Sequence, residues 1–184
     1  METLEGYRKS HVEYGMPYFW TATINNWNYL LLNDAMKMEV IQSLQWLTQR
    51  ALISIYAYVI MPNHVHLIWT VKDNNGKESP QGSLLKFTAH RFKKILFQSQ
   101  PDILKIYEVN ASNKTHEFWQ RDSLALPVFS RPFLLEKIVY IHNNPVAKHW
   151  RLATEPASYR FSSASFFESG IDEFGILSPI TELW

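Results

Sequence analysis

The sequence predicts an α+β fold with the element order βαββαβ and an antiparallel sheet. Three observations predict it. Stretches rich in β-branched and aromatic residues alternate with stretches in which apolar residues recur at helical spacing. Pro62 and Asn63 supply a turn between two such stretches, which makes them an antiparallel hairpin. The chain of 184 residues is long enough for one domain with a substantial core.

The first strand is expected over residues 17–24, where aromatic and β-branched residues cluster. The first helix is expected from Asp34 to about Arg50. Asn33 can cap its beginning, and apolar residues follow at helical spacing. The order of these two elements is that of the first half of a βαββαβ unit.

The hairpin is expected to consist of strands 53–60 and 64–71, followed by a polar loop at 73–82 and a second helix at 83–98. In the first of these strands one face is expected to carry Ile53, Ile55, Ala57 and Val59. This order is most of a ferredoxin-like unit, in which both helices cover one face of the sheet.

The pattern weakens after the second helix. Residues 100–116 indicate a loop with a short helix around 102–107. Short strands are expected at 117–121 and 127–129, because each is a brief apolar or aromatic stretch.

A further helix is expected to begin after Ser130, which can cap it, and to end before Pro145. We expect a single domain over 1–184, with a core at about 17–149. Residues 150–184 indicate a coil-rich C-terminal extension with aromatic anchors.

Composition excludes several classes of protein. Hydrophobic residues make up 46% of the chain, which argues against disorder, and the lack of cysteine excludes disulfides and thiolate metal sites. The net charge is only +1, so a nucleic-acid surface would have to be local. Since neither a membrane-spanning run nor a secretory signal is evident, we expect a cytoplasmic protein without a membrane partner.

Two histidines open the second hairpin strand. His64 and His66 flank a valine, and successive side chains of a strand point to opposite faces, so the two imidazoles share one face. Neutral histidines placed in this way can converge on one divalent metal ion. In the alternative interpretation, the two rings only form hydrogen bonds within a polar face of the sheet.

A second cluster lies on the helix that ends near Asn144. Tyr140 and Asn144 are four residues apart, so they share a helix face and lie ~6 Å apart along the axis. A site that combines these two groups with the two imidazoles could cleave a phosphodiester through a covalent phosphotyrosine. The alternatives are core packing for Tyr140 and turn chemistry for Asn144. His142 lies about 200° round the helix from Tyr140 and is interpreted as structural.

Four short segments, taken together and in order, resemble the REP-associated tyrosine transposases, a family in the HUH superfamily of single-tyrosine enzymes. This superfamily is named for two histidines that flank a hydrophobic residue. The resemblance extends from about Tyr18 to about Phe166. The segments are Met61–His66, Phe118–Asp122, Tyr140–Val146 and Tyr159–Ala164.

The resemblance implies a bacterial enzyme that cleaves and joins single-stranded DNA near a hairpin, the repeated extragenic palindrome. It implies that Tyr140 is the nucleophile, and that Mg²⁺ or Mn²⁺ is held by His64, His66 and Asn144. The products of cleavage would be a 5′-phosphotyrosine and a free 3′-hydroxyl. The protein would act as a monomer or a homodimer. The segment 147–150 departs from relatives, which often have a basic, glycine-containing turn there.

The second helix offers a local basic surface, since its cationic residues gather on one side and its leucines on the other. With a DNA-cleaving site nearby, we predict phosphate contacts from Lys86, His90, Arg91, Lys93 and Lys94. The alternative interpretation is a solvated amphipathic helix without a DNA-binding role.

Two other functions compete with that of a transposase. A DNA- or RNA-binding module could have kept the fold and lost catalysis, but such a module has no need for all four site residues. A replication or conjugation relaxase of the same superfamily would share the site, although such enzymes usually carry further domains.

Overall fold

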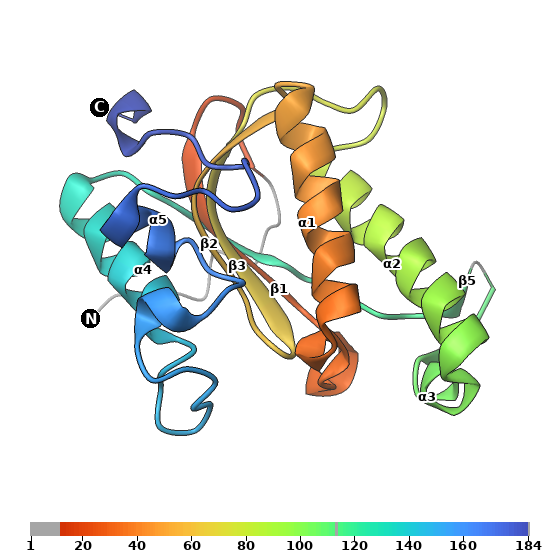
Figure 1. The fold of residues 1–184 in the computed structure, drawn as a ribbon. Coiled ribbons are helices and arrows are strands. Elements are labelled where there is room, and N and C mark those ends of the chain that lie inside the picture. The colour runs from red at the N-terminus through yellow and green to blue at the C-terminus, as the bar shows by residue number, and fades with distance from the viewer. Residues whose placement is uncertain (1–11, 113, 184) are drawn as a thin grey trace, which may run out of the picture.

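The computed structural model, which describes residues 12–112 and 114–183, contains a four-stranded antiparallel sheet in the order β2-β3-β1-β6. Helices α1 and α2 lie side by side on one side of the sheet, and α4 lies on the other (Figure 1). This arrangement confirms the α+β prediction, with β6 as the last strand of the βαββαβ unit. The outermost parts of the expected domain 1–184 lie outside the described residues.

The sheet and its three long helices have the following bounds: β1 (Pro17–Thr23), α1 (Asp34–Gln49), β2 (Ile53–Ile60), β3 (His64–Val71), α2 (Pro80–Ser99), β6 (Leu124–Pro127) and α4 (Arg131–Asn143). The shorter elements are η1 (Asn25–Trp27), η2 (Leu30–Leu32), α3 (Pro101–Lys105), β4 (Glu108–Ala111), β5 (Lys114–His116), η3 (Pro156–Ser158), α5 (Ala164–Ser169) and η4 (Ile180–Glu182).

The helix caps follow from the sequence. Asn33 accepts a hydrogen bond from a backbone N–H of the first turn of α1 at 2.9 Å, and Ser130 caps α4 as expected. The second helix begins at Pro80 rather than at 83, because Ser79 caps it and proline is favoured in a first turn, where its missing N–H has no partner to lose.

The strand β2 contains a β-bulge. Ile55 pairs with Trp69, whereas Ala57 pairs with Ile68, the direct neighbour of Trp69. Tyr56 is therefore an extra residue in β2. An extra residue reverses the alternation of faces beyond it. The prediction that one face carries Ile53, Ile55, Ala57 and Val59 is therefore wrong after the bulge.

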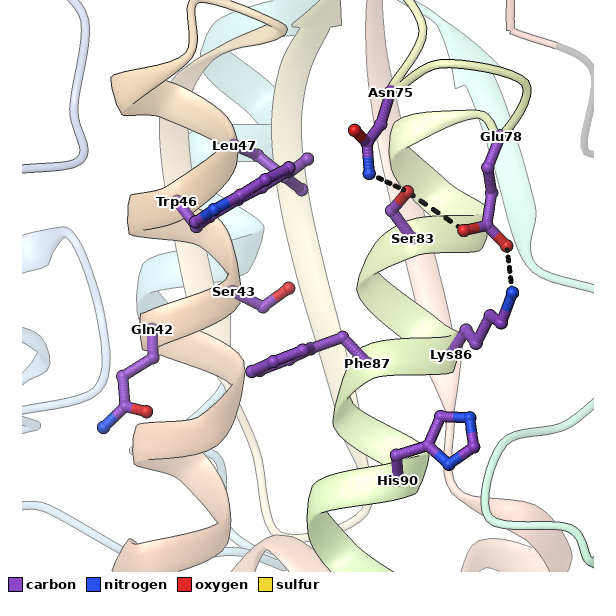
Figure 2. Close-up of a pocket in the computed structure, with 10 residues that line it drawn as sticks. All are labelled: Gln42, Ser43, Trp46, Leu47, Asn75, Glu78, Ser83, Lys86, Phe87 and His90. Carbon is purple, nitrogen blue, oxygen red and sulfur yellow. Dashed lines mark hydrogen bonds and ion pairs between the residues drawn. The ribbon is translucent and has the colours of Figure 1, made fainter.

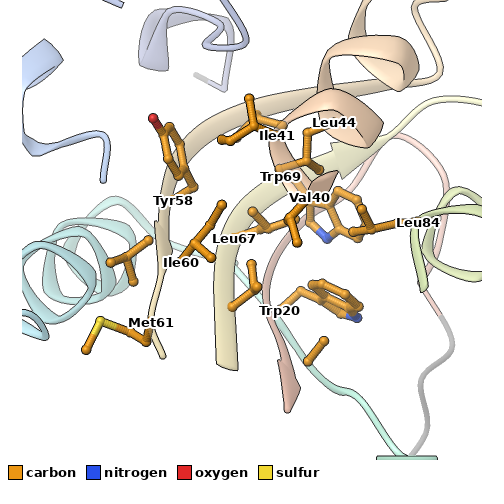
Figure 3. Packing of buried hydrophobic residues seen from close by; sticks show 14 of the residues in the cluster. Trp20, Val40, Ile41, Leu44, Tyr58, Ile60, Met61, Leu67, Trp69 and Leu84 are labelled. Carbon is orange, nitrogen blue, oxygen red and sulfur yellow. The ribbon is translucent and has the colours of Figure 1, made fainter. Parts of the chain in front are cut away.

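The main core lies between the sheet and the α1–α2 pair. Trp20 and Trp69 are fully buried, with ring centroids 5.0 Å apart, and Val40 and Leu84 come from the two helices (Figure 3). Burying each large apolar side chain contributes about 1.5–3 kcal/mol. Trp20 points to this side, so its neighbour Thr21 points to the α4 side.

The region between α2 and α4 departs most from expectation. The hairpin of β4 and β5 stands where a loop was expected, and residues 117–121 form only one bridge, between Trp119 and Ile24. The last sheet strand ends at Pro127 instead of running over 127–129. Short strands of mixed polarity lack the alternation by which a strand is predicted, and proline cannot donate to a ladder.

The C-terminal extension covers the open edge of β2. Val59 forms a bridge with Ser162, and the hydroxyl of Tyr159 donates to the carbonyl of Ile60 at 2.8 Å. An uncovered edge strand would invite pairing with another chain. No helix in the described part of the chain has both the length and the apolar character to cross a bilayer.

Candidate active site

The histidine pair, His64 and His66, lies on the face of β3 that is turned toward α4. The two ring centroids are 4.6 Å apart, and only 8% and 5% of the two residues are exposed. The register of β1 and β3 sets this orientation, because His66 is paired with Thr21, which points away from the α1–α2 side. The two imidazoles therefore share one face, as the spacing predicted.

Each imidazole is oriented through its Nδ1 atom. Nδ1 of His64 lies 2.6 Å from Oδ1 of Asn63, and since an amide oxygen only accepts, Nδ1 carries the proton. The amide nitrogen of Asn63 donates to the carbonyl of Trp27 at 3.3 Å, which fixes the orientation of the amide. Nδ1 of His66 lies 2.7 Å from the hydroxyl of Thr21. A histidine that donates from Nδ1 presents a lone pair at Nε2, as metal-binding histidines do.

The free nitrogen of His66 has no partner. Its Nε2 atom is buried and makes no hydrogen bond within residues 12–112 and 114–183. Such a buried polar atom costs about 1–3 kcal/mol when it is left without a partner. A metal ion is one species that would satisfy it.

Both histidines are uncharged at neutral pH. Burial, reinforced by His64, lowers the pKa of His66 to about 3, and burial, reinforced by His149, lowers the pKa of His64 to about 4. Neutral imidazole is the form that binds a cation. The residues present therefore fit a divalent metal ion.

Tyr140 lies beside this pair. Its ring centroid is 5.4 Å from that of His66 and 6.0 Å from that of Phe19, and the residue is 50% exposed. Tyr58 and Tyr159, in contrast, are buried, and burial raises the pKa of both phenols. A half-exposed phenol thus lies beside the buried imidazole of His66.

Asn144 is the C-cap residue of α4, one turn beyond Tyr140, and is 9% exposed. Among the described residues, no three histidine, cysteine or carboxylate side chains cluster as a metal site. The ligand role of Asn144 stays a prediction.

His142 and Trp119, which lie in the segments that carry the resemblance, connect elements of the fold. Nε2 of His142 lies 2.8 Å from the hydroxyl of Ser163, which also accepts from the backbone N–H of Tyr58 at 3.0 Å. His142 thus ties α4 to β2 and to the C-terminal extension. Trp119 is buried and donates to the hydroxyl of Thr88 at 3.0 Å. The contact of His142 agrees with its structural interpretation, and Trp119 has a packing role.

The five residues predicted to contact DNA lie on α2, across the sheet from the histidine pair. The expectation that this helix stands beside the cleavage site is wrong, because both crossover helices of a βαββαβ unit cover the same face and the imidazoles point to the other. A direct contact between these residues and DNA stays a prediction.

The surroundings of these five residues differ. Arg91 forms a bidentate ion pair with Glu39 of α1, with N–O distances of 2.7 and 2.9 Å, so its charge is neutralised. Lys86 lies 3.6 Å from Glu78, and both border a groove of about 610 Å³ between α1 and α2 that His90 also lines (Figure 2). The remaining two, Lys93 and Lys94, are exposed.

Three contacts of the site were missed in the sequence. Thr21 orients His66 and depends on a strand register that no local pattern reveals. Asn63 orients His64 in addition to forming the turn, and its place directly before the first histidine is the signal for this contact. Trp150 was placed in a coil-rich extension, yet its ring centroid lies 6.1 Å from that of His64.

No protein-family model matches the chain, and no curated protein matches its sequence. The chain is similar to several solved structures, among them the following two. A REP-associated tyrosine transposase bound to a REP hairpin matches with a TM-score of 0.60 and 19% identity, over 90% of this chain and 87% of that chain. A putative transposase from Deinococcus radiodurans matches with a TM-score of 0.41 and 20% identity, over 78% of this chain and 97% of that chain. The first likeness shows that this chain has the fold of a REP-associated tyrosine transposase, the family that its sequence resembles.

Proposed function

We propose that the protein is a metal-dependent HUH-type transposase that cleaves single-stranded DNA beside a hairpin and transfers the cut strand. The observation that carries this proposal is the half-exposed phenol of Tyr140 next to the buried histidine pair. The shared fold supports it, since the solved relative is bound to a REP hairpin. Such an enzyme would act in the bacterial cytoplasm.

The metal ion would be held by Nε2 of His64, Nε2 of His66 and the side-chain oxygen of Asn144. The buried Nε2 of His66, which has no protein partner among the described residues, supports this assignment. A set with two imidazoles suits Mn²⁺ better than Mg²⁺, which prefers oxygen ligands. All three ligands are neutral, so a bound cation supplies its full positive charge to the scissile phosphate and the leaving oxygen.

Tyr140 would supply the nucleophile. Its phenolic oxygen bonds to phosphorus as the bond from phosphorus to the 3′ oxygen breaks. The phenol loses a proton and the leaving 3′ oxygen gains one, so the step is balanced. The ammonium group of Lys137 lies 5.9 Å from the centroid of the Tyr140 ring and pairs with Glu136 at 2.9 Å.

The covalent link would conserve the energy of the broken phosphodiester. A 3′-hydroxyl from another strand end can therefore attack the phosphotyrosine in the reverse sense and rejoin DNA without ATP. The outcome is strand transfer rather than hydrolysis.

The test uses a hairpin with single-stranded flanks, labelled at its 3′ end so that the covalently held fragment is visible. With Mn²⁺, the protein should give an adduct that resists denaturation, and Tyr140→Phe should abolish it. Tyr14→Phe is the matched control, because Tyr14 is 53% exposed and hydrogen-bonded to Asn74, which follows the end of β3 opposite to His64.

Two results would contradict the proposal. An adduct that persists in Tyr140→Phe removes Tyr140 from its role. Binding of hairpins without any adduct favours the alternative, a DNA- or RNA-binding module that has lost catalysis.

A further inference from the structure

Two tryptophan side chains border the histidine pair on its His64 side, whereas Tyr140 lies against His66. The ring centroids of Trp27 and Trp150 are 6.5 and 6.1 Å from that of His64. Tyr29 extends the group, with its ring centroid 5.7 Å from that of Trp150. Trp27, Tyr29 and Trp150 are called the aromatic platform below.

The platform is accessible. Trp27 is 59% exposed and Tyr29 is 61% exposed, while Trp150 is partly buried. Large aromatic side chains are most stabilising when their area is buried. Three of them gathered at the rim of one site, with two largely open to solvent, therefore point to a ligand that covers them.

The backbone holds this platform in an unfavourable conformation. Trp27 has a φ of 56° and Arg151, next to Trp150, has a φ of 48°. Left-handed backbone is unfavourable for bulky residues and persists where the surroundings impose it. At Trp27 these surroundings include Asn63. Its amide nitrogen donates to the carbonyl of Trp27, and its amide oxygen orients His64.

Positive charge accompanies the platform. Lys148 and Arg151 flank Trp150 in sequence and are exposed. Neither takes part in an ion pair within the described part of the chain. Exposed aromatic rings beside free cations are the combination that binds a single-stranded nucleic acid, since bases stack on the rings and phosphates contact the cations.

We infer that the aromatic platform stacks unpaired bases of the DNA strand that enters the site, with Lys148 and Arg151 on its phosphates. This inference rests on the proposed function, because it names where that substrate is held. Duplex bases are already stacked on one another, so the platform selects single strands. The basic face of α2, across the sheet, is not needed for this contact.

The test separates binding from chemistry by using Tyr140→Phe protein, without divalent metal, and a fluorescein-labelled twelve-nucleotide oligothymidine. Stacking of one base is worth about 1–3 kcal/mol, so Trp27→Leu and Trp150→Leu should each weaken binding about 5- to 150-fold in fluorescence anisotropy. Trp150→Phe, which keeps an aromatic face, should retain most of the affinity. Trp46→Leu is the matched control, because Trp46 is 40% exposed on α1, across the sheet.

Three results would overturn the inference. The first is full affinity in the Trp27 and Trp150 leucine variants, and the second is an equal loss in Trp46→Leu. The third is no binding of the single strand by the parent protein. Circular dichroism of each variant shows whether it is folded, and Trp150→Phe against Trp150→Leu decides the matter if other variants unfold.

The inference and the proposed function can fail separately. Loss of affinity in the platform variants, with no Tyr140 adduct in the wild type, leaves the platform standing and removes the chemistry. A wild-type adduct together with full affinity in the platform variants leaves the chemistry and removes the platform.

Discussion

Acid should destabilise this protein through its buried histidines, and His66→Asn should reduce the loss of stability. The pKa of His66 is lowered by burial to about 3 in the folded state, against 6.5 for an unperturbed imidazole. A lowered folded-state pKa means that the unfolded chain binds more protons. The contribution of the neutral His66 to the free energy of unfolding is therefore fully present above about pH 6.5 and is lost as the pH falls toward 3.

The magnitude follows from the size of the shift. Each pH unit below the unfolded pKa costs about 1.4 kcal/mol until the folded state is also protonated. At pH 5 the loss from His66 is therefore about 2 kcal/mol. His64, with a pKa of about 4, should lose a similar amount over the same range.

The assay is urea unfolding of metal-free protein at pH 7.5 and pH 5.0. His66→Asn keeps a side-chain donor for Thr21 and should lose about 2 kcal/mol less than the wild type between the two values. The control His90→Asn removes an exposed imidazole from α2 and should follow the wild type. Equal losses with and without His66 would refute the account of its burial.

Three further predictions concern the orientation of His64, the pH range of metal binding and the ion pair between Arg91 and Glu39. Asn63→Ala frees Nδ1 of His64 and should weaken Mn²⁺ binding about 10- to 100-fold in calorimetric titration, and unchanged affinity would show that this contact does not orient a ligand. Because the pKa values of His64 and His66 are about 4 and 3, Mn²⁺ affinity should hold from pH 7.5 to pH 5.5; a tenfold drop would mean that protons compete there. Arg91→Met leaves the buried carboxylate of Glu39 without its partner and should lower the midpoint of urea unfolding, whereas an unchanged midpoint would show that water replaces the pair.

Much of the fold could be predicted because its signals are local. Asn33 and Ser130 mark the beginnings of α1 and α4, and the turn at Pro62 fixes the hairpin that carries the histidine pair. The grouping of the histidines with Tyr140 is a chemical hypothesis that the resemblance supports. No spacing rule brings β3 and α4 together.

The remainder depends on contacts between distant parts of the chain. The bulge at Tyr56 reverses the faces of β2, and only the pairing with β3 reveals it. Thr21 orients His66 through register, and Trp150 reaches the site from the C-terminal extension. The basic surface of α2 was correctly predicted as an amphipathic face but lies on the other side of the sheet, because a helical period says nothing about which face of a sheet the helix covers.

The most direct measurement is mass spectrometry of the protease-digested protein–DNA adduct formed with Mn²⁺ on a hairpin substrate. We expect one modified peptide, from α4, with a nucleotide joined through its 5′-phosphate to the phenolic oxygen of Tyr140. A nucleotide on any other residue, or one joined through a 3′-phosphate, would contradict it.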